Sequence, residues 1–425
     1  MVETKLSKAT LRGFRKLPDK AIVSIFSFAS QITIQDATRP VPFLIRAGQV
    51  SQRWRTIVHE TPSLWRYIPI VDPSRLKYPK FFIEKSGDCD LEVFVLAKNA
   101  GTGAALKTVL GCTNRLSSLS IRITTASLLF VVVNLLRDAK APRLKQLEVM
   151  IDAPTTRLGH LPSIFTAHPP PLRSLRLEGS SFEYGNSLFN NLSFLTLVNL
   201  PRDMSQPSHS TLREIFHIAP KLRRLALVGV VPKLPPGVEY DKIKAPSLSY
   251  LHITVTETCK VNHVQELFTV LTAPALRTLS YTSDGLASFG AFESSVPIIS
   301  SRYPELQGLH LTVVSNKVPS TAPANMELFR SFPELKYLVL NVVDDGFAEY
   351  FLRAWISASQ QNDEGTIKPW PKFKLLTLRA PYNDRDDEEE QVDDLLETLG
   401  TARSSLGLDF DVFEESITED QIRPN

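Results

Sequence analysis

A short sequence motif, Ala-Pro-x-Leu-x-x-Leu-x-Leu, recurs along the chain and constrains its fold more than any other feature. It is complete at residues 141–149, and close copies begin at Ala219, Ala245 and Ala273. Looser copies lack the alanine but keep the proline, and two copies keep only the three apolar positions. The copies have as their first apolar residue Leu116, Leu144, Leu172, Leu192, Leu222, Leu248, Leu276, Leu306, Leu335 and Phe373. Units that recur every 20 to 38 residues are typical of a solenoid, in which neighbours stack to bury their apolar faces.

Each copy predicts a strand, and the stretches between copies predict helices. The last two apolar residues of a copy are two positions apart, which places both on one face of a strand. The proline ahead of them ends a preceding helix, because it has no N–H group to donate. Apolar residues at helical spacing predict helices within residues 128–136, 212–218, 261–271, 326–329 and 347–356. The alternative is an ordinary α/β sheet protein with βα units.

The composition bounds the class of protein. With 43% hydrophobic and 22% charged residues, the chain is typical of a soluble globular protein, and no apolar run reaches the roughly 18 residues of a membrane span. The N-terminus lacks the apolar core of a signal peptide. Three scattered cysteines favour a reducing compartment, and a net charge of +3 does not by itself indicate nucleic acid. We therefore expect a cytoplasmic or nuclear protein that contacts neither membranes nor nucleic acid.

Residues 17–70 predict a small helical module. Pro18 suits the first helical position, Pro42 can begin a second helix, and Ser51 can cap a third. Three short helices form a marginal core when left alone. Their surplus apolar surface is a reason to expect a partner.

This module resembles an F-box. The resemblance is carried by Leu17-Pro18 with Ile22, Ile25 and Phe26, by Val50-Ser51-Gln52-Arg53-Trp54-Arg55, and by Pro62-Ser63-Leu64-Trp65. The longer middle segment is similar to the F-box-like variant abundant in mushroom-forming fungi. In that family the F-box binds the Skp adaptor, and through it a cullin scaffold, of a ubiquitin ligase. The resemblance therefore implies an adaptor-binding set, namely Leu17, Pro18, Ile22, Ile25, Phe26, Val50, Trp54 and Trp65. A purely structural alternative is that the helices only cap the first repeat.

The spacing of the repeats resembles the leucine-rich repeat family over residues 110–380. We predict an α/β fold, a leucine-rich-repeat solenoid with a parallel sheet and outer helices, preceded by a small all-α three-helix F-box module. The expected organisation is a basic flexible N-terminus at 1–16, the F-box-like module at 17–70, a connecting region with a degenerate first repeat at 71–115, the solenoid with an acidic C-terminal helix at 116–411, and a tail at 412–425. The acidic run at 384–394 is either a solvated helix face or a binder of basic patches. A final strand is expected near 406–410.

The residues that alternate with the strand leucines point away from the core and are candidates for binding. Aromatic residues and arginine concentrate interface energy. This predicts a substrate-binding set for an unknown protein substrate, namely Arg176, Phe194, Arg224, Tyr250, His252, Tyr337 and Arg379. The alternative is a generic polar face whose real site lies on the rim loops.

No catalytic motif occurs in its proper context, whether nucleophile elbow, zinc pattern, phosphate loop or dinucleotide fingerprint. We therefore predict no catalytic residue, no metal and no cofactor. The leading hypothesis is the substrate-recognition subunit of a Skp–cullin–F-box ubiquitin ligase. A second is a non-catalytic leucine-rich-repeat scaffold or inhibitor module that engages no ligase. A third is a cryptic hydrolase or transferase, which requires a deep pocket with clustered titratable groups.

Overall fold

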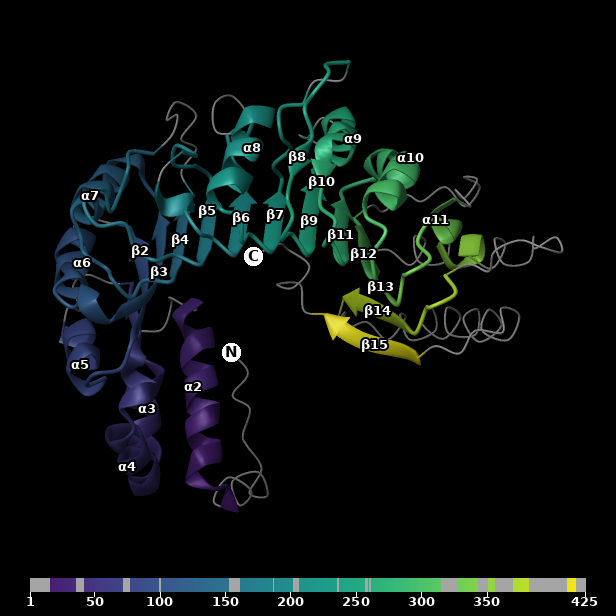
Figure 1. The fold of residues 1–425 in the computed structure, drawn as a ribbon. Helices are drawn as coiled ribbons and strands as arrows, with labels where there is room; N and C mark the ends of the chain where they lie inside the picture. The colour runs from purple at the N-terminus through teal and green to yellow at the C-terminus, as the bar shows by residue number, and fades with distance from the viewer. Residues whose placement is uncertain are drawn as a thin grey trace. The chain divides into compact units, whose positions relative to one another are not determined.

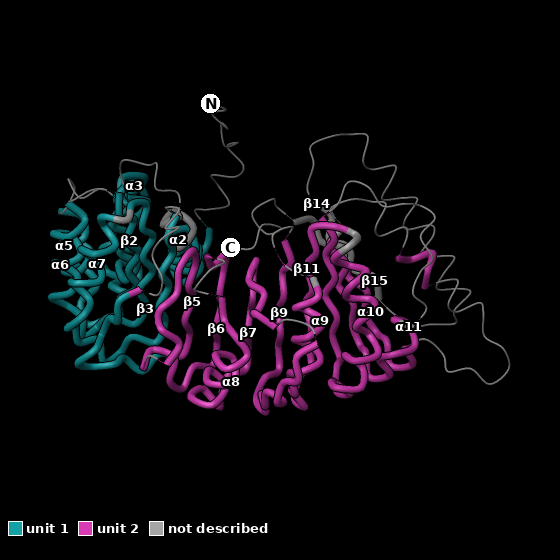
Figure 2. Tube along the Cα trace, turned by 90° about the horizontal axis from the view of Figure 1, so that it is seen from above, with its two compact units in different colours: residues 1–155, 162–172 teal, residues 156–161, 173–425 magenta. Residues whose placement is uncertain are grey.

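The computed structural model describes residues 16–35, 42–71, 77–98, 101–152, 161–185, 187–201, 206–234, 237–256, 259, 261–314, 327–342, 351–355, 370–381 and 411–417. The chain divides into two compact units (Figure 2). The first unit holds Met1–Thr155 with Pro162–Leu172, and the second holds Thr156–Leu161 with Arg173–Asn425. Each unit is described by itself.

The first unit begins with helices α2 (Asp19–Gln35), α3 (Phe43–Val50) and α4 (Gln52–Glu60), and with the 3-10 turn η1 (Pro62–Arg66) (Figure 1). Pro18 stands just before α2, one position earlier than predicted, and its carbonyl accepts hydrogen bonds from the N–H groups of Ala21 and Ile22 at 3.0 and 3.2 Å. Ser51 caps α4 as predicted, because its Oγ accepts from the Trp54 N–H at 3.2 Å. The helical character expected for this stretch is therefore confirmed.

The rest of the first unit is a parallel sheet with helices. Its strands, in spatial order, are β1 (Tyr67–Ile70), β2 (Leu91–Ala97), β3 (Leu116–Ile123) and β4 (Gln146–Ile151). Its helical segments are α5 (Lys77–Lys85), α6 (Thr102–Leu110), η3 (Thr113–Arg115) and α7 (Ala126–Arg137). The sequence predicts the first degenerate repeat at β2 and misses β1. This strand is short and carries Pro69, which is tolerated because β1 lies at the edge of the sheet.

The second unit is a longer parallel sheet. Its strands, in spatial order, are β5 (Ser174–Glu178), β6 (Phe194–Val198), β7 (Arg224–Val228), β9 (Tyr250–Val255), β11 (Thr278–Ser283), β12 (Gly308–Val313), β13 (Tyr337–Val342), β14 (Leu375–Pro381) and β15 (Asp411–Ile417). Every strand from β3 to β14 in the two units begins within one copy of the repeated motif, apart from the short strands β8 (Ile243–Lys244) and β10 (Leu271–Thr272). The strands predicted from the repeats are therefore confirmed.

Helices connect the strands of the second unit. They are η4 (Ser187–Phe189), α8 (His209–Ile218), α9 (Val261–Val270), α10 (Leu286–Arg302) and α11 (Glu327–Arg330), with a small sheet of β8 (Ile243–Lys244) and β10 (Leu271–Thr272). α8 and α9 lie along one face of the parallel strands (Figure 2). The repeated leucines face inward and are buried, as the neighbours Leu195, Leu225 and Leu251 illustrate.

Several sequence-based expectations fall on other parts of the chain. The acidic run at 384–394 and the strand expected near 406–410 lie outside the described residues. Strand β15 runs from Asp411 to Ile417, so the predicted tail at 412–425 begins inside a strand. The other predicted domain boundaries stay predictions. None of the helices in the described ranges combines the length and apolarity needed to span a lipid bilayer.

Candidate functional site

The helices of the first unit meet around Phe26. Its side chain is 2% exposed, and its ring packs edge-on against Phe43 at 5.7 Å and Trp54 at 4.9 Å between ring centroids. Ile22, one turn earlier on α2, is equally buried. Burying such side chains stabilises a small core by about 1.5–3 kcal/mol each. Phe26 therefore holds α2 onto α3 and α4, and Ile22 adds to the same unit's core.

Trp65 packs against α5, the helix that follows the first helical group in the chain. Its indole N–H donates to the Val58 carbonyl at 2.7 Å, and its ring contacts Phe81 and Phe82 on α5 at 5.2 and 5.0 Å. The side chain is 1% exposed. Trp65 is therefore a buried anchor between η1, α4 and α5.

Arg53 ties the beginning of α2 to α4. Its guanidinium donates to the Leu17 carbonyl and, through Nε, to Asp19 Oδ1 at 2.9 Å. This position lies in the Gln-Arg-Trp-Arg stretch of the sequence but outside the predicted adaptor-binding set. The contacts orient Leu17 and Pro18, which lie at the surface of the helical group.

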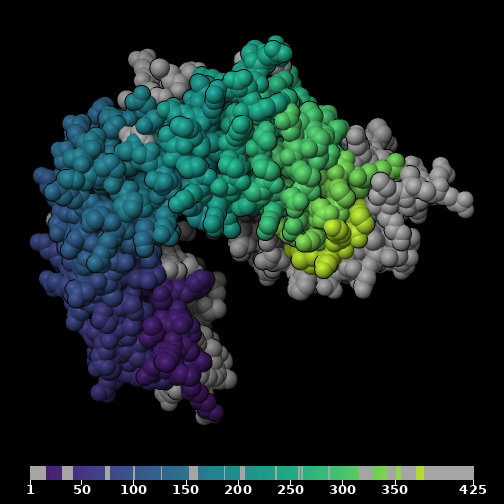
Figure 3. All heavy atoms as spheres, viewed as in Figure 1, coloured from purple at the N-terminus to yellow at the C-terminus, as the bar shows by residue number. Residues whose placement is uncertain are grey.

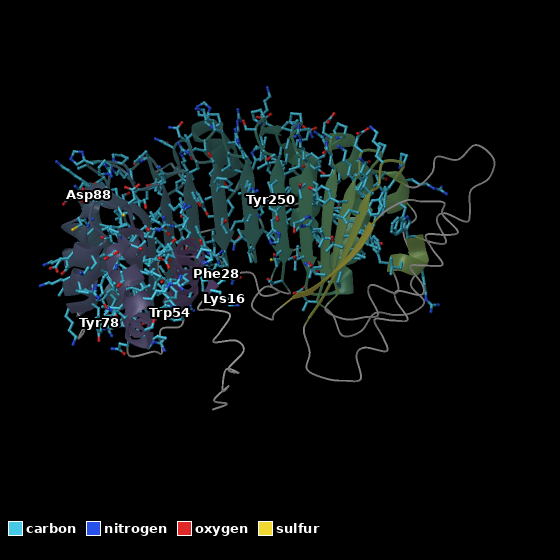
Figure 4. The ribbon with its side chains drawn as sticks, turned by 90° about the horizontal axis from the view of Figure 1, so that it is seen from below. Lys16, Phe28, Trp54, Tyr78, Asp88 and Tyr250 are labelled. Atoms are coloured by element: carbon cyan, nitrogen blue, oxygen red, sulfur yellow. The ribbon has the colours of Figure 1, made fainter. Side chains whose placement is uncertain are left out.

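A second set of apolar side chains on the same helices is open to solvent. Ile25 is 42%, Phe28 is 66% and Val50 is 63% exposed. Ile25 and Phe28 are three residues apart on α2, so they lie on one face of the helix. Helix α2, in purple, forms part of the molecular surface (Figure 3). Phe28 and the part-buried Trp54 are labelled in Figure 4. Sequence reasoning missed Phe28, although its spacing from Ile25 is the signal that could have found it.

The outward face of the sheet in the second unit aligns several predicted binding residues. Phe194, Arg224 and Tyr250 occupy the same register position on the neighbouring strands β6, β7 and β9. The Arg224 guanidinium lies 5.5 Å from the centroid of each ring. A cation between two aromatic faces is held by its attraction to both rings. These three residues therefore form one continuous patch on the outward face, in which Tyr250 is labelled in Figure 4.

Tyr337 extends the same register row. Its hydroxyl lies 2.6 Å from Thr278 Oγ1, and its ring passes over Gly308 on the strand between them. The ring also meets His310 edge-on at 6.0 Å between centroids. Tyr337 is therefore positioned by its neighbours rather than freely extended.

His252 and Arg176 are already engaged within the sheet. The ring nitrogens of His252 lie 2.8 Å from Ser280 Oγ and 3.0 Å from Thr254 Oγ1, and burial lowers its pKa to about 4. Arg176 forms an ion pair with Glu178 at 3.0 Å. Both side chains therefore have partners inside the protein. Arg379 lies on β14, but its side chain is outside the described part of the chain.

A comparison with protein families identifies the helical group. Residues 14–69 match the F-box-like family. This part of the chain is an F-box-like domain. Such domains typically bind Skp-type adaptors, which suggests a general role as a ubiquitin ligase adaptor. No curated protein matches the chain.

The matched range contains all eight residues of the predicted adaptor-binding set, but the structure divides them by burial. Ile22, Phe26 and Trp65 lie in the core of the first unit, so they support the surface of the F-box-like domain from beneath. The residues left at or near the surface are Leu17, Pro18, Ile25, Val50 and Trp54. Leu17 and Trp54 are half-buried, and the exposed members Pro18, Ile25 and Val50 together with Phe28 make up the exposed apolar set.

A pocket of about 450 Å³ adjoins the F-box-like domain between α3, α4, η1 and α5. Leu44, Val58 and Phe81 contribute to its apolar lining. Its charged lining residues are basic, and one of them, Arg55, is held in place because its Nε donates to the Gly48 carbonyl at 3.0 Å. The pocket has room for apolar side chains of a partner or for a small ligand.

The titratable groups with strongly shifted pKa values do not line this pocket. Burial raises the pKa of Tyr281 and of Tyr303, and their hydroxyls donate to the backbone carbonyls of Ser288 at 2.8 Å and Leu271 at 3.3 Å. Among the described residues, no group of histidine, cysteine, aspartate and glutamate side chains could hold a metal ion. These tyrosines serve packing, and the expected lack of catalytic residues stays a prediction.

Proposed function

We propose that this chain is the substrate-recognition subunit of a Skp–cullin–F-box ubiquitin ligase. The observation that carries the proposal is the F-box-like domain at residues 14–69. In this proposal the domain docks the Skp adaptor and, through it, the cullin, while the repeated units form a leucine-rich-repeat solenoid that binds the target protein. The chain performs no chemistry itself. It raises the effective concentration of the target at the ubiquitin donor.

The exposed apolar set is the proposed adaptor contact. Ile25, Phe28 and Val50 are large apolar side chains exposed on one helical group, and exposed apolar patches mark sites of interaction with other proteins. Arg53 supports the contact by holding Leu17 and Pro18 in place. The buried residues Ile22 and Phe26 contribute indirectly, through the position of α2.

The patch of Phe194, Arg224 and Tyr250 is the proposed centre of the target contact. Residues of these types carry a large share of the binding energy at protein interfaces. Tyr337 lies on the same register row of the sheet. We expect the complex to act in the cytoplasm or nucleus.

One observation favours the second hypothesis, a non-catalytic leucine-rich-repeat scaffold or inhibitor module that engages no ligase. α2 packs against β1, and Trp65 packs against α5, so the helices cover the first strand of the sheet. A repeat array needs such a cap at its end. A cap that also docks the adaptor satisfies both hypotheses, so a binding experiment must separate them.

The deciding experiment is co-purification of the full chain with a Skp adaptor, comparing the wild type with an Ile25→Ser/Phe28→Ser variant. Phe130→Ser is the matched control, because Phe130 is 51% exposed on α7, outside the F-box-like domain. We expect the wild type and the control to bind and the double variant to lose about tenfold or more in affinity. Circular dichroism checks that all three proteins fold. A wild type that binds no adaptor would leave the helices as a cap and favour the scaffold.

A further inference from the structure

A row of basic residues follows the amino edge of the sheet in the second unit. The residues immediately before β5, β6, β7, β9, β11, β12, β13 and β14 are Arg173, Ser193, Arg223, Ser249, Arg277, Gln307, Lys336 and Lys374. From Ser193 onward, each N–H group donates to the backbone carbonyl of the preceding member of this series, at 2.8 to 3.0 Å. These eight positions are therefore direct neighbours in space, although they are spread over some 200 residues of sequence. We call Arg173, Arg223, Arg277, Lys336 and Lys374 the basic row.

Within strands β5 to β14 of the described chain, acidic side chains do not offset the charge of the basic row. Neither its eight positions nor the adjacent register row that contains Arg224 includes an acidic residue between β5 and β14. Arg173, Arg223, Arg277 and Lys374 are exposed. No ion pair joins these four to an acidic side chain in the described part of the chain.

The turns ahead of the row do not cancel this charge either. Glu334 pairs with Lys372 at 2.6 Å, which leaves Glu305 as the acidic residue of those turns without an ion pair among the described residues. An exposed band of one sign attracts ligands of the opposite sign. The basic row therefore favours an anionic partner.

The spacing of the row narrows the class of partner. Arg173, Arg223, Arg277 and Lys336 stand before every second strand, β5, β7, β11 and β13. Because neighbouring strands are about 4.8 Å apart, these cations recur about every 9.6 Å. A polyproline II segment rises about 3.1 Å per residue and has three residues per turn, so every third side chain lies on one side, about 9 Å from the next. A peptide of this kind matches the row with one anionic side chain per turn.

We propose that the basic row binds an extended acidic segment of the target protein, with an anionic side chain at every third residue. The inference rests on the proposed function, because that function makes the target a protein, and it adds the chemical class of the segment. The guanidinium groups supply paired N–H donors that match carboxylate or phosphate oxygens. Ser193, between two of the arginines, offers a hydroxyl to the peptide backbone. The Ser249 hydroxyl donates to the Arg223 carbonyl at 3.2 Å, so it is left to accept from the peptide.

The neighbouring aromatic residues argue against single-stranded nucleic acid as the partner. Proteins that bind single strands stack bases on open aromatic faces. Here the faces of Phe194 and Tyr250 that flank Arg224 are occupied by its guanidinium, and the Tyr337 hydroxyl is bonded to Thr278. Arg224 therefore covers one face of each of these two rings, which leaves fewer open faces for bases beside the row.

The test measures binding of a labelled peptide of four Glu-Pro-Pro repeats to the full chain. Three further probes are a Gln-Pro-Pro peptide, a peptide of the same composition with its four glutamates contiguous, and oligouridylate. A phosphoserine-Pro-Pro peptide distinguishes phosphate from carboxylate as the preferred anion. We expect the spaced glutamate peptide to bind more tightly than the glutamine and contiguous peptides, with affinity that falls as salt is added.

The matching protein variant is Arg223→Gln/Arg277→Gln. Its control is Lys98→Gln/Lys244→Gln, which removes the same charge from exposed positions that are not members of the row. We expect the row variant to bind the spaced peptide about tenfold more weakly and the control to bind it like the wild type. Equal binding of the spaced and contiguous peptides, an unaffected row variant, or tighter binding of oligouridylate would each overturn the proposal.

The same proteins are also tested for Skp adaptor binding, so that the two proposals fail separately. Loss of adaptor binding with retained peptide binding would remove the ligase role and keep the acidic-segment site. Retained adaptor binding with no peptide binding in the wild type would keep the ligase role and remove the basic row as its target site.

Discussion

The hydroxyl of Tyr337 lies 2.6 Å from Oγ1 of Thr278, two strands away, and the ring reaches it by passing over Gly308. A Cβ atom at Gly308 would stand about 2.0 Å from the Tyr337 ring, which is inside any permitted contact. The absence of a side chain at Gly308 therefore decides where Tyr337 lies on the outward face of the sheet.

Replacing Gly308 with alanine should displace the Tyr337 ring and break its hydrogen bond. We expect a loss of about 1–3 kcal/mol in the free energy of unfolding, measured by denaturant titration. Gly290→Ala is the control, because a Cβ there meets nothing within 4 Å and helix α10 should gain about 0.5–1 kcal/mol. Adding Tyr337→Ala to Gly308→Ala should recover most of the loss. No recovery in the double variant would show that the ring is not the obstacle.

Two phenylalanines of α2, two residues apart, should behave in opposite ways. Phe26→Ala removes a ring that is 2% exposed and packed on Phe43 and Trp54, so we expect it to destabilise the chain by about 3–5 kcal/mol. Phe28→Ala removes a ring that is 66% exposed, and we expect a change within about 0.5 kcal/mol but weaker binding of the Skp adaptor. Thermal unfolding and co-purification measure the two effects. Loss of stability in both variants would place Phe28 in the core instead.

Arg53→Gln tests how the beginning of α2 is held. The ion pair between Arg53 and Asp19 is solvent-exposed, so we expect its loss to lower the free energy of unfolding by no more than about 1 kcal/mol. The free energy of binding to the Skp adaptor should fall by more than the free energy of unfolding, because Leu17 also loses the donor to its carbonyl. Asp19→Asn isolates the ion pair, since it leaves the bond to Leu17 in place. If both variants bind the adaptor like the wild type, Arg53 has no role in docking.

His252 should make the stability of the chain depend on pH. Burial lowers its pKa from 6.5 to about 4, so the folded state favours the neutral ring. Its contribution to stability is fully present above pH 6.5 and is lost as the pH falls toward 4, because the unfolded chain binds the proton first. Unfolding measured across this window should show a smaller decline for His252→Gln than for the wild type, and NMR titration of the ring should give the low pKa directly. Equal declines in the two proteins would contradict the assignment.

Arg224→Gln tests the patch on the outward face. Removing the cation between Phe194 and Tyr250 should lower the free energy of unfolding by about 1–2 kcal/mol, since two cation–π contacts are lost. The variant should also weaken target capture while leaving adaptor binding unchanged. Arg224→Lys keeps a positive charge and should recover part of both properties. A variant that captures the target like the wild type would move the target site elsewhere.

The local spacing of apolar residues predicted most strands and the helical structure of the F-box-like domain. The repeat at Leu144, Leu147 and Val149 marks β4, and the same spacing marks its counterparts, because a strand with one buried face needs apolar residues at every second position. The short strand β1 escaped prediction, since four residues with a proline carry too little periodicity to be distinguished from a loop.

The sequence alone determined the repeating units and the F-box resemblance, because both depend on apolar residues at short, regular spacing. The tertiary structure decided which of those residues are exposed. Ile22 and Phe26 are buried while Ile25 and Phe28 are open, a division that depends on which side of α2 the other helices cover. It also decided that Arg173, Arg223 and Arg277 stand in one row. Each of the three follows the first apolar residue of its copy, but the copies are separated by connections of different length, and the hydrogen bonds of the folded sheet bring the residues side by side.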